Sequence, residues 1–399
     1  MTPRKLLFAT SSIFFPDSSG GAERSLLRLF DGLRRRGWEV EVVCGRSLRS
    51  PHAWKAAAAA LLRLRAPRLF ARDEAGGLRA WRGLRRFRGR PAWTAWFDGF
   101  LDAYRPDAVL GYNNLTCPLL GRALDRGLPC FFVVRSLANL FAASRFIPDG
   151  VHLLANSPFA ASVAAAATGR PAEVVLPLVD AAGYRVEGRQ RRYVTFVNPT
   201  PEKGVAVALA VARALPETRF LFVKGRWGDR SYETVARGLP NVEVWDHRHD
   251  MRAVYAVTDV LLVPSQWLET FGRVVVEAQQ SGIPVVAADV GGLPFTVGEG
   301  GLLVRPKGDP AAYVEALRRL RADQALYAEL SARALANSRR PEFDPEAQAD
   351  AFVAIVERAL AAGASPRPAG GLVPGRAAEE RPRPPRDERL PGPARAAQR

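Results

Sequence analysis

The feature that most constrains the fold is an alternation of short β-rich runs with helical patterns, which occurs in two successive segments. In the first segment, a Gly-containing loop at 15–21 separates the opening strand from a helical pattern at about 22–36, which Gly37 closes. The strand-like runs of this segment lie at 5–10, 40–43, 108–111, 130–135 and 152–155. Strands that alternate with helices in this way predict βαβ units and a parallel sheet.

The second segment repeats the alternation. Its strand-like runs lie at 193–197, 219–224, 242–245, 260–263 and 284–287, and its helical patterns lie at 204–214, 251–256 and 271–281. A polar, Gly-containing stretch at 181–192 separates the two segments and is the predicted linker. For a chain of 399 residues, two domains of ordinary size are expected. We therefore predict an α/β protein of two doubly wound domains.

The positive charge is concentrated in two places. The formal net charge is +17, and 13 Lys or Arg residues lie within 46–90 against Asp73 and Glu74. Eight more arginines lie in a Pro-rich end of the chain, 364–399, which has no apolar periodicity and is predicted to be disordered. The rest of the chain is nearly neutral, so a general polyanion-binding surface on the main fold is not supported.

The sequence predicts neither a signal peptide nor a cysteine-based metal site. The apolar run after Lys5 is too short for a signal peptide, and no uncharged apolar run approaches 18 residues. We therefore expect a cytoplasmic protein. Cys44, Cys117 and Cys130 lack paired metal spacing and are expected to be reduced core thiols.

Two glutamates flank the start of the helix expected after the strand at 260–263. Glu269 precedes this helix, whose start we place near Phe271, and Glu277 lies eight residues further, about 12 Å at 1.5 Å per residue. Ligands of open α/β folds bind at this sheet edge, and the free amides of a helix start favour a diphosphate. Taken alone, such a pair is more often a cap and a solvated face. In this setting, one carboxylate can meet sugar hydroxyls and the other a ribose.

The residues that surround this pair carry a family resemblance. The stretch from Val260 to Val304 contains Ser-Gly-Ile-Pro-Val-Val-Ala at 281–287, Asp-Val-Gly-Gly-Leu-Pro at 289–294 and Glu-Gly-Gly-Leu-Leu-Val at 299–304. It resembles the donor-binding signature of the group 1 glycosyltransferases, the retaining family 4 of the GT-B fold. The resemblance covers most of residues 4–362 and is stronger in the second domain.

The resemblance implies a fold and an activity. Two Rossmann-like domains would face a cleft, an acceptor-side domain at 1–182 and a donor-binding domain at 183–343. A helix at 344–362 would cross back to the first domain, ahead of a tail at 363–399. The reaction would move a sugar from a nucleotide-diphosphate donor to an acceptor hydroxyl, with retention of anomeric configuration. The departing phosphate oxygen would accept the acceptor's proton, so no side-chain nucleophile is nominated.

The resemblance also implies the donor-binding residues. Glu269 would bind the donor sugar and Glu277 the ribose. Lys203 would reach the phosphates, helped by backbone amides of the Gly-Gly loop and of the helix start. Many family members carry an arginine about five residues before this lysine, whereas this chain has a neutral asparagine, so a second cation is missing or comes from elsewhere. The remaining predicted donor-binding residues are Gly20, Gly21, Asn198, Thr270, Phe271, Gly272 and Arg273.

A third catalytic candidate, besides Glu269 and Lys203, lies at the end of the strand 130–135. Family members often have a histidine there, and this chain has Arg135. Two interpretations stay open: Arg135 contacts a donor or acceptor phosphate, or it is an ordinary charge at a strand end.

No metal or other cofactor is expected. His247 and His249 lie in the loop that would hold the nucleotide base, but no third ligand is spaced nearby. The sequence also lacks an Asp-x-Asp pair that could chelate a metal diphosphate. Both the residues and the resemblance therefore favour a metal-independent reaction.

The partners are only partly defined by the sequence. The expected ones are the nucleotide-sugar donor and a glycan, lipid-linked or small-molecule acceptor. The basic segment 46–90 interleaves arginines with Trp, Leu and Phe, which suits helical stretches lying on an anionic membrane, peripherally on its inner face. The alternative is a basic insertion that covers the first domain. Nucleic acid is disfavoured because no recognised binding motif accompanies the charge.

Two other functions remain compatible with the sequence. A nucleotide-sugar 2-epimerase shares the two-domain architecture and would use acidic residues of the cleft for proton transfer. A non-catalytic protein that binds nucleotide sugars would keep the donor pocket without the transfer.

Overall fold

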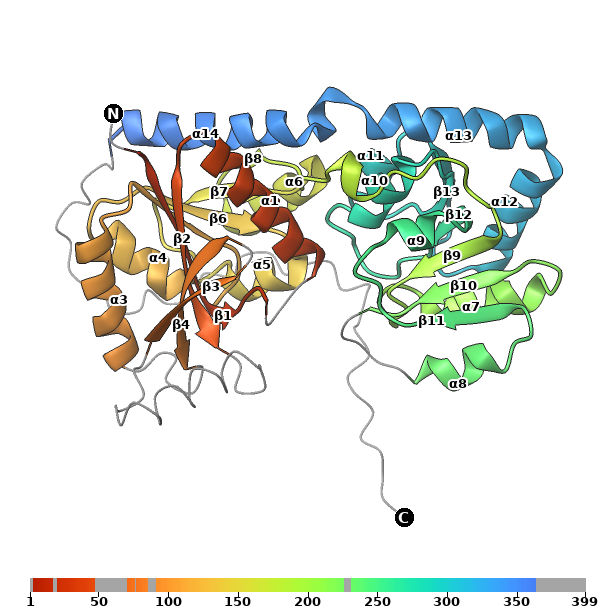
Figure 1. Ribbon diagram of the computed structural model, residues 1–399, viewed down its shortest axis with the longest axis horizontal. Helices are drawn as coiled ribbons and strands as arrows, with labels where there is room; N and C mark the ends of the chain where they lie inside the picture. Colours follow the sequence, from red (N-terminus) through yellow and green to blue (C-terminus); the bar gives the residue numbers. More distant parts are fainter. Residues whose placement is uncertain are drawn as a thin grey trace, which may run out of the picture. The chain divides into compact units, whose positions relative to one another are not determined.

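The computed structural model describes residues 3–16, 20–46, 70–75, 77–84, 91–225 and 231–363. Within these ranges, the strands form two sheets (Figure 1). The predicted tail, 363–399, lies outside the described residues apart from Gly363. Among the described residues, no helix has the length and apolar content needed to cross a membrane.

The first sheet contains eight strands among the described residues, in the order β3-β4-β2-β1-β5-β6-β7-β8. All neighbouring strands are parallel except β3, which pairs antiparallel with β4. The strands are β1 (Lys5–Ile13), β2 (Glu39–Arg46), β3 (Phe70–Ala75), β4 (Leu78–Leu84), β5 (Ala108–Gly111), β6 (Cys130–Val134), β7 (His152–Ala155) and β8 (Ala172–Val174). The predicted strands of this segment are therefore present, with ends shifted by a few residues at most.

Helices cover both faces of this sheet. In β1, Leu6 and Phe8 pack in one apolar cluster, and Leu7 and Ala9 pack in another on the opposite face. This alternation is the period of two expected of a strand that is buried on both sides. The first cluster includes α1 (Gly21–Arg35), and the second includes α3 (Pro91–Tyr104), α4 (Cys117–Leu124), α5 (Leu137–Ala143) and α6 (Pro158–Thr168).

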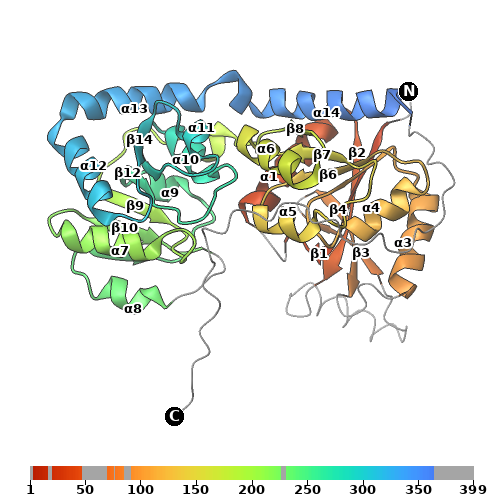
Figure 2. The same cartoon turned by 180° about the vertical axis from the view of Figure 1, so that it is seen from behind.

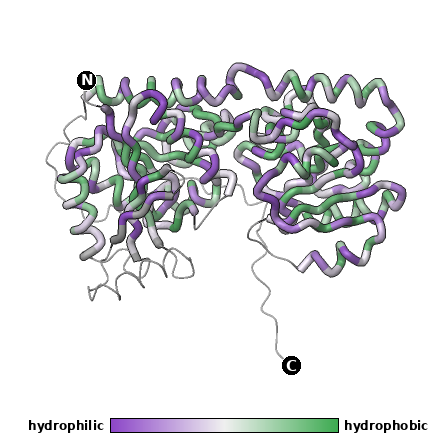
Figure 3. Tube along the Cα trace, viewed as in Figure 1, coloured by the Kyte–Doolittle hydropathy of each residue, from purple (hydrophilic) through white to green (hydrophobic). Residues whose placement is uncertain are grey.

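The second sheet has six parallel strands among the described residues, in the order β11-β10-β9-β12-β13-β14. Its strands are β9 (Tyr193–Val197), β10 (Phe220–Val223), β11 (Val242–Trp245), β12 (Thr258–Val263), β13 (Val285–Ala288) and β14 (Gly301–Val304). Its helices are α7 (Val205–Ala214), α8 (Tyr232–Arg237), α9 (Arg252–Tyr255), α10 (Arg273–Gln279), α11 (Leu293–Val297), α12 (Pro310–Ala322) and α13 (Gln324–Ser338), and short 3-10 turns lie at Ala181–Gly183 and Pro341–Phe343. Figure 3 shows the apolar character of its strands in green.

The helix that contains Glu277 begins two residues later than predicted. Gly272 precedes it with a φ of +81°, a left-handed conformation that an α-helix does not contain. Phe271 and Gly272 therefore belong to the loop, and α10 starts at Arg273. A Cβ atom on Gly272 would lie 2.4 Å from Leu293 Cδ2, so the loop packs closely on α11.

The last described helix returns to the first sheet, as expected. α14 (Pro345–Ala361) packs against α1, which slopes away from it in the ribbon view (Figure 1, Figure 2). Its Phe352 and Val356 are part of the apolar cluster that contains α1. Arg36 Nε also donates to Asp350 Oδ1 at 2.6 Å. The packing of α14 is thus both apolar and ionic.

The expectation of helical stretches throughout the basic segment 46–90 is wrong for its described part. Residues 70–75 and 78–84 form the antiparallel pair β3 and β4. Arg82 is 1% exposed and donates to Phe15 O at 2.6 Å, and Trp81 packs against Trp96 and Phe100. Trp81 contributes to the core of the first domain because alternate residues of a strand such as β4 point to opposite faces of the sheet. The remainder, 47–69 and 85–90, lies outside the described residues.

Candidate functional site

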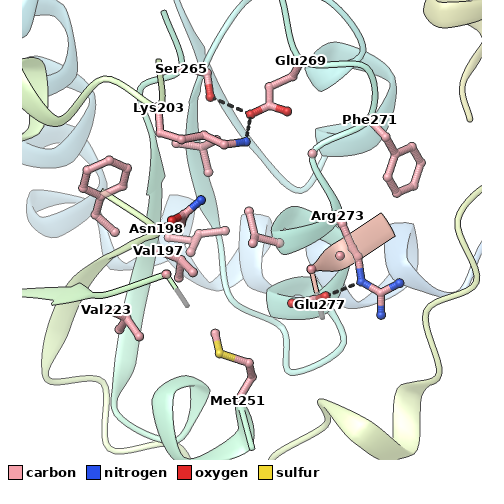
Figure 4. Close-up of a pocket in the computed structure, with 18 of the residues that line it drawn as sticks. Val197, Asn198, Lys203, Val223, Met251, Ser265, Glu269, Phe271, Arg273 and Glu277 are labelled. Atoms are coloured by element: carbon pink, nitrogen blue, oxygen red, sulfur yellow. Dashed lines mark hydrogen bonds and ion pairs between the residues drawn. The ribbon is translucent and has the colours of Figure 1, made fainter. Parts of the chain in front are cut away.

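A cavity of about 500 Å³ lies at the carboxyl ends of strands from the second sheet (Figure 4). It is lined by β12 residues, by the loops after β9, β10 and β12, and by residues of the first domain. The cavity brings together every site residue predicted from the sequence, which are Gly20, Gly21, Arg135, Asn198, Lys203, Glu269, Thr270, Phe271, Gly272, Arg273 and Glu277. It is the candidate donor pocket.

Lys203 and Glu269 form an ion pair within this pocket. Ser265 Oγ donates to the same carboxylate oxygen of Glu269 at 3.1 Å, and the Lys203 ammonium lies 5.1 Å from the centre of the Trp267 ring. Burial on its own raises the pKa of Glu269, but the charge of Lys203 and the hydrogen bonds to the carboxylate lower it overall. Glu269 is therefore an ionised hydrogen-bond acceptor at neutral pH.

The backbone around Lys203 explains how its side chain reaches the pocket. Gly204 has a φ of +85° and ends the loop just before α7. A Cβ atom at Gly204 would lie 1.9 Å from Pro264 O, so only glycine allows this loop to approach the end of β12. The close approach brings Lys203 beside Glu269, 66 positions away in the sequence.

Glu277 is held by two donors at the opposite side of the pocket (Figure 4). Arg273 Nε donates to one carboxylate oxygen at 2.6 Å, and the Tyr255 hydroxyl donates to the other at 3.0 Å. Burial, together with the charge of Glu277, raises the pKa of Tyr255 well above its ordinary value, so this hydroxyl stays protonated. Each oxygen of Glu277 keeps a lone pair for a further donor such as a ligand hydroxyl.

The guanidinium of Arg273 donates to protein groups and thereby holds Glu277 in place. Besides Glu277, it donates to Leu178 O at 3.0 Å and to the Tyr184 hydroxyl at 2.9 Å. These contacts fix the guanidinium one helical turn before Glu277. The sequence predicted Arg273 as a donor-binding residue, and the geometry makes it the group that orients Glu277.

Thr270 links the loop between β12 and α10 to the first domain. Its hydroxyl donates to Arg135 O at 3.0 Å and accepts from Asn156 Nδ2 at 3.0 Å. Ser157 Oγ donates to the carbonyl of Thr270 and also accepts from the amide of Ala160, which caps α6. Sequence reasoning missed Asn156 and Ser157. The available signal was a polar pair directly after a predicted strand, at the sheet edge where ligands bind.

The two glycines of the first loop lie at the pocket wall. The Gly20 amide donates to Glu23 Oε2 at 2.9 Å, and a Cβ atom on Gly21 would lie 3.3 Å from Arg273 Cδ. The loop backbone therefore comes close to the side chain that orients Glu277. Residues 17–19 of this loop lie outside the described residues.

Arg135 and Asn198, which the sequence analysis singled out as departures from the resemblance, both line the pocket. Arg135 lines the pocket and is half-buried, and burial lowers the pKa of its guanidinium to about 10, so it stays charged at neutral pH. Asn198, with a φ of +60°, contributes a neutral side chain to the pocket lining.

Polar residues near the predicted base-binding loop also escaped the sequence analysis. Lys224 follows β10 and pairs with Glu233 at 2.7 Å and with Asp246 at 3.0 Å. It lines the pocket together with His247 and Met251. His247 and His249 pack ring to ring, with centroids 5.1 Å apart. No spacing in the sequence connects Lys224 to Asp246, because β10 and β11 bring them together.

Comparison with known families assigns both halves of the chain. Residues 191–323 match the family model described as "Glycosyl transferases group 1", and residues 20–175 match the one described as "Glycosyl transferase 4-like domain". The first match contains Lys203, Glu269 and Glu277, and the second contains Gly20, Gly21 and Arg135. The six strands of the second sheet fall within the first match, and the strands of the first sheet fall within the second match except β1, which precedes it.

Curated relatives match over shorter stretches. A D-inositol 3-phosphate glycosyltransferase of Streptomyces bingchenggensis is 45% identical over 101 residues, which are 25% of this chain and 22% of the relative. The sulfoquinovosyl transferase SQD2 of Arabidopsis thaliana is 38% identical over 133 residues, 31% of this chain and 25% of the relative. The chain thus spans about a quarter of the length of these relatives.

Solved structures share the fold over nearly the whole described chain. Sucrose-phosphate synthase from Thermosynechococcus elongatus superposes with a TM-score of 0.74 at 19% identity, covering 90% of this chain and 100% of that one. HepE from Anabaena, in complex with UDP-glucose, gives a TM-score of 0.68 at 20% identity, with 89% and 99% covered. This is the predicted GT-B arrangement, and with both family models matched in order, the chain belongs to the group 1 glycosyltransferases.

Proposed function

We propose that this protein transfers a sugar from a nucleotide-diphosphate donor to an acceptor hydroxyl, with retention of anomeric configuration. The observation that carries the proposal is the pair of buried carboxylates in one pocket, Glu269 and Glu277, each held by a cation and a hydroxyl. Such carboxylates are suited to accept hydrogen bonds from the hydroxyls of a sugar and of a ribose. The UDP-glucose complex of HepE adds support from a protein of the same fold.

The chemistry that follows uses the donor's own diphosphate. The bond between the anomeric carbon and the phosphate oxygen breaks, and a bond to the acceptor oxygen forms on the same face of the sugar. The acceptor's proton moves to the departing phosphate oxygen. Lys203 stabilises the negative charge that develops on this diphosphate, while Glu269 and Glu277 hold the two ends of the donor. Catalysis then depends on orientation and electrostatics.

Nucleotide binding is the first experiment. A thermal-shift screen of UDP-, GDP- and ADP-sugars should identify one base that raises the melting temperature, because a ligand that binds only the folded state stabilises it. Glu277→Gln should abolish most of that shift, and Glu315→Gln, which changes a carboxylate remote from the donor pocket, is the matched control. A screen with no stabilising nucleotide sugar would refute the donor assignment.

Product analysis separates transfer from the two alternatives. With the accepted donor and candidate acceptors, NMR of the product should show the anomeric configuration of the donor. A 2-epimerase would instead convert the nucleotide sugar without any acceptor, and a non-catalytic binding protein would leave it unchanged. An inverted product would refute the retention part of the proposal.

We also propose that the transfer needs no metal ion. Cationic side chains that line the pocket, including Lys203 and Arg135, can compensate the diphosphate charge. The turnover rate should therefore be the same with EDTA as with added Mg²⁺ or Mn²⁺. A loss of turnover in EDTA that either metal restores would contradict this proposal.

Contact with an anionic membrane remains a proposal for the undescribed part of the basic segment. Residues 47–69 and 85–90 carry nine of the 13 cations of 46–90 and no acidic residue. Each cation near an anionic bilayer contributes about 1 kcal/mol of attraction. Flotation with anionic liposomes at low salt, but not with neutral ones, is the expected result, and flotation with neither would exclude the contact.

A further inference from the structure

The cationic side chains of the donor pocket differ in whether a carboxylate already compensates their charge. Among the described residues, Lys203 pairs with Glu269, and Arg273 pairs with Glu277. Lys224 likewise pairs with Glu233 and Asp246, whereas Arg248 is exposed and stacks on Trp245 with a separation of 5.1 Å. The two remaining cations of the pocket, Arg24 and Arg135, come from the first domain.

Arg24 differs from its neighbours on α1 in having no protein partner for its guanidinium among the described residues. Glu23, one position earlier, accepts from the Gly20 amide at 2.9 Å, and Arg28, one turn later, pairs with Asp180 at 3.2 Å. Arg24 itself is half-buried in the first turn of α1, directly after the Gly-Gly loop. Arg24 is thus a partly desolvated cation whose guanidinium N–H donors are available to a ligand.

The place of Arg24 identifies the kind of ligand that it can reach. It lines the donor pocket together with Gly20 and Gly21, and it also lines an adjoining cavity of about 360 Å³. Arg273 borders both cavities as well, so Arg24 lies where they meet. An anion bound beside the backbone of Gly20 and Gly21 would therefore lie next to Arg24.

We propose that Arg24 binds the diphosphate of the nucleotide-sugar donor and supplies a cation from the first domain in addition to Lys203. This inference rests on the proposed function. The donor diphosphate is a dianion, and Lys203 shares its charge with Glu269. A guanidinium offers two parallel N–H donors to a phosphate, which a lysine cannot do.

This arrangement divides the charge compensation of the leaving group between the two domains. Lys203 acts from the second sheet and Arg24 from the first helix of the other domain. When the sugar–phosphate bond breaks, the departing nucleoside diphosphate gains negative charge, and Arg24 stabilises that charge. Loss of Arg24 should therefore lower kcat as well as donor affinity.

The test compares ligands that differ only in their phosphates. With the base identified by the thermal-shift screen, calorimetric titration of the full chain should give the Kd values of the nucleoside diphosphate and of the nucleoside. In Arg24→Gln, the affinity for the diphosphate should fall about 10- to 100-fold, the factor typical of one charge-assisted contact. The affinity for the nucleoside should stay unchanged, and Arg24→Lys should recover part of the loss.

Arg28→Gln is the matched control, since it removes an arginine one turn further along the same helix, where Asp180 already compensates the charge. It should bind the diphosphate like the wild type. The melting temperature of Arg24→Gln should also be nearly unchanged, because the Arg24 guanidinium makes no ion pair or hydrogen bond with the residues that the structure describes.

Two results would overturn the inference while leaving the proposed function intact. One is a diphosphate affinity of Arg24→Gln within twofold of the wild type. The other is an increase in the acceptor KM alone, which would assign Arg24 to an anionic acceptor. If the wild type binds none of the nucleotides, the proposed function itself fails, so the two failures are distinguishable.

Discussion

Replacing one member of the buried ion pair Arg273–Glu277 should lower the free energy of unfolding more per residue changed than replacing both members together. The two side chains are 12% and 7% exposed, and their closest atoms are 2.6 Å apart. Arg273→Met leaves a buried carboxylate without its cation, and Glu277→Met leaves a buried guanidinium without its anion. Each single substitution should therefore destabilise the surrounding structure by about 3–5 kcal/mol.

The double substitution to methionine removes both charges together. It should cost no more than either single change, because only neutral partners such as the Tyr255 hydroxyl and the Leu178 carbonyl lose a contact. The coupling energy of the cycle should thus be about 3 kcal/mol or more.

Native-state hydrogen exchange of the α10 amides is the suitable assay for this cycle. It reports the free energy of local opening without requiring the whole chain to unfold in one step. The four proteins of the cycle would be compared at one pH and temperature. Additive single effects, with a coupling energy below about 1 kcal/mol, would refute the argument that charge compensation holds the pair in place.

Two further predictions concern the loop that carries Glu269. The lowered pKa of Glu269 stabilises the fold above the ordinary carboxyl pKa of 4.5, and this contribution is lost as the pH falls through the lowered value. In Lys203→Met, burial dominates and raises the pKa of Glu269, so the ionised carboxylate destabilises the fold at neutral pH and this penalty disappears as the pH falls. The melting temperatures of the wild type and the variant should therefore converge in acid, and a difference that is the same at every pH would contradict the assignment. Gly291→Ala should destabilise the protein by about 1–3 kcal/mol and weaken donor binding, because φ is +60° and the new Cβ would lie 2.3 Å from Glu269 O. Gly308→Ala, where the nearest atom is 3.4 Å away, is the control, and equal melting temperatures of the two variants would refute the steric argument.

The sequence predicted the central strands of both sheets, because hydrophobic periodicity and breakers determine strands locally, but it missed β3, β4, β8 and β14. The expected strands at 108–111, 152–155 and 242–245 coincide with β5, β7 and β11. The helix start near Phe271 was misplaced by two residues, since the left-handed conformation of Gly272 arises from packing against α11. Local propensity carries no information about such a contact.

The residues of the pocket fall into two groups with different predictability. Glu269, Glu277 and Lys203 lie within recognisable motifs, and all three line the cavity. Tyr255, which donates to Glu277, and Ser157, which donates to the carbonyl of Thr270, were not foreseen. Tyr255 lies 22 positions from Glu277, and Ser157 lies 113 positions from Thr270. Only the tertiary fold defines such pairs, so a single sequence gives no pattern for them.

The pairing of charges also explains how the pocket can be stable before a donor enters it. Unpaired carboxylates at these depths would pay a desolvation penalty that Coulomb attraction within each pair offsets. A donor must then compete with these pairs: its hydroxyls add to the free lone pairs of the carboxylates, while its diphosphate draws Lys203 partly away from Glu269. The attraction between the diphosphate and Lys203 is reduced by this competition. Arg24, which pairs with no carboxylate among the described residues, should therefore contribute more of its charge to donor binding than Lys203 does.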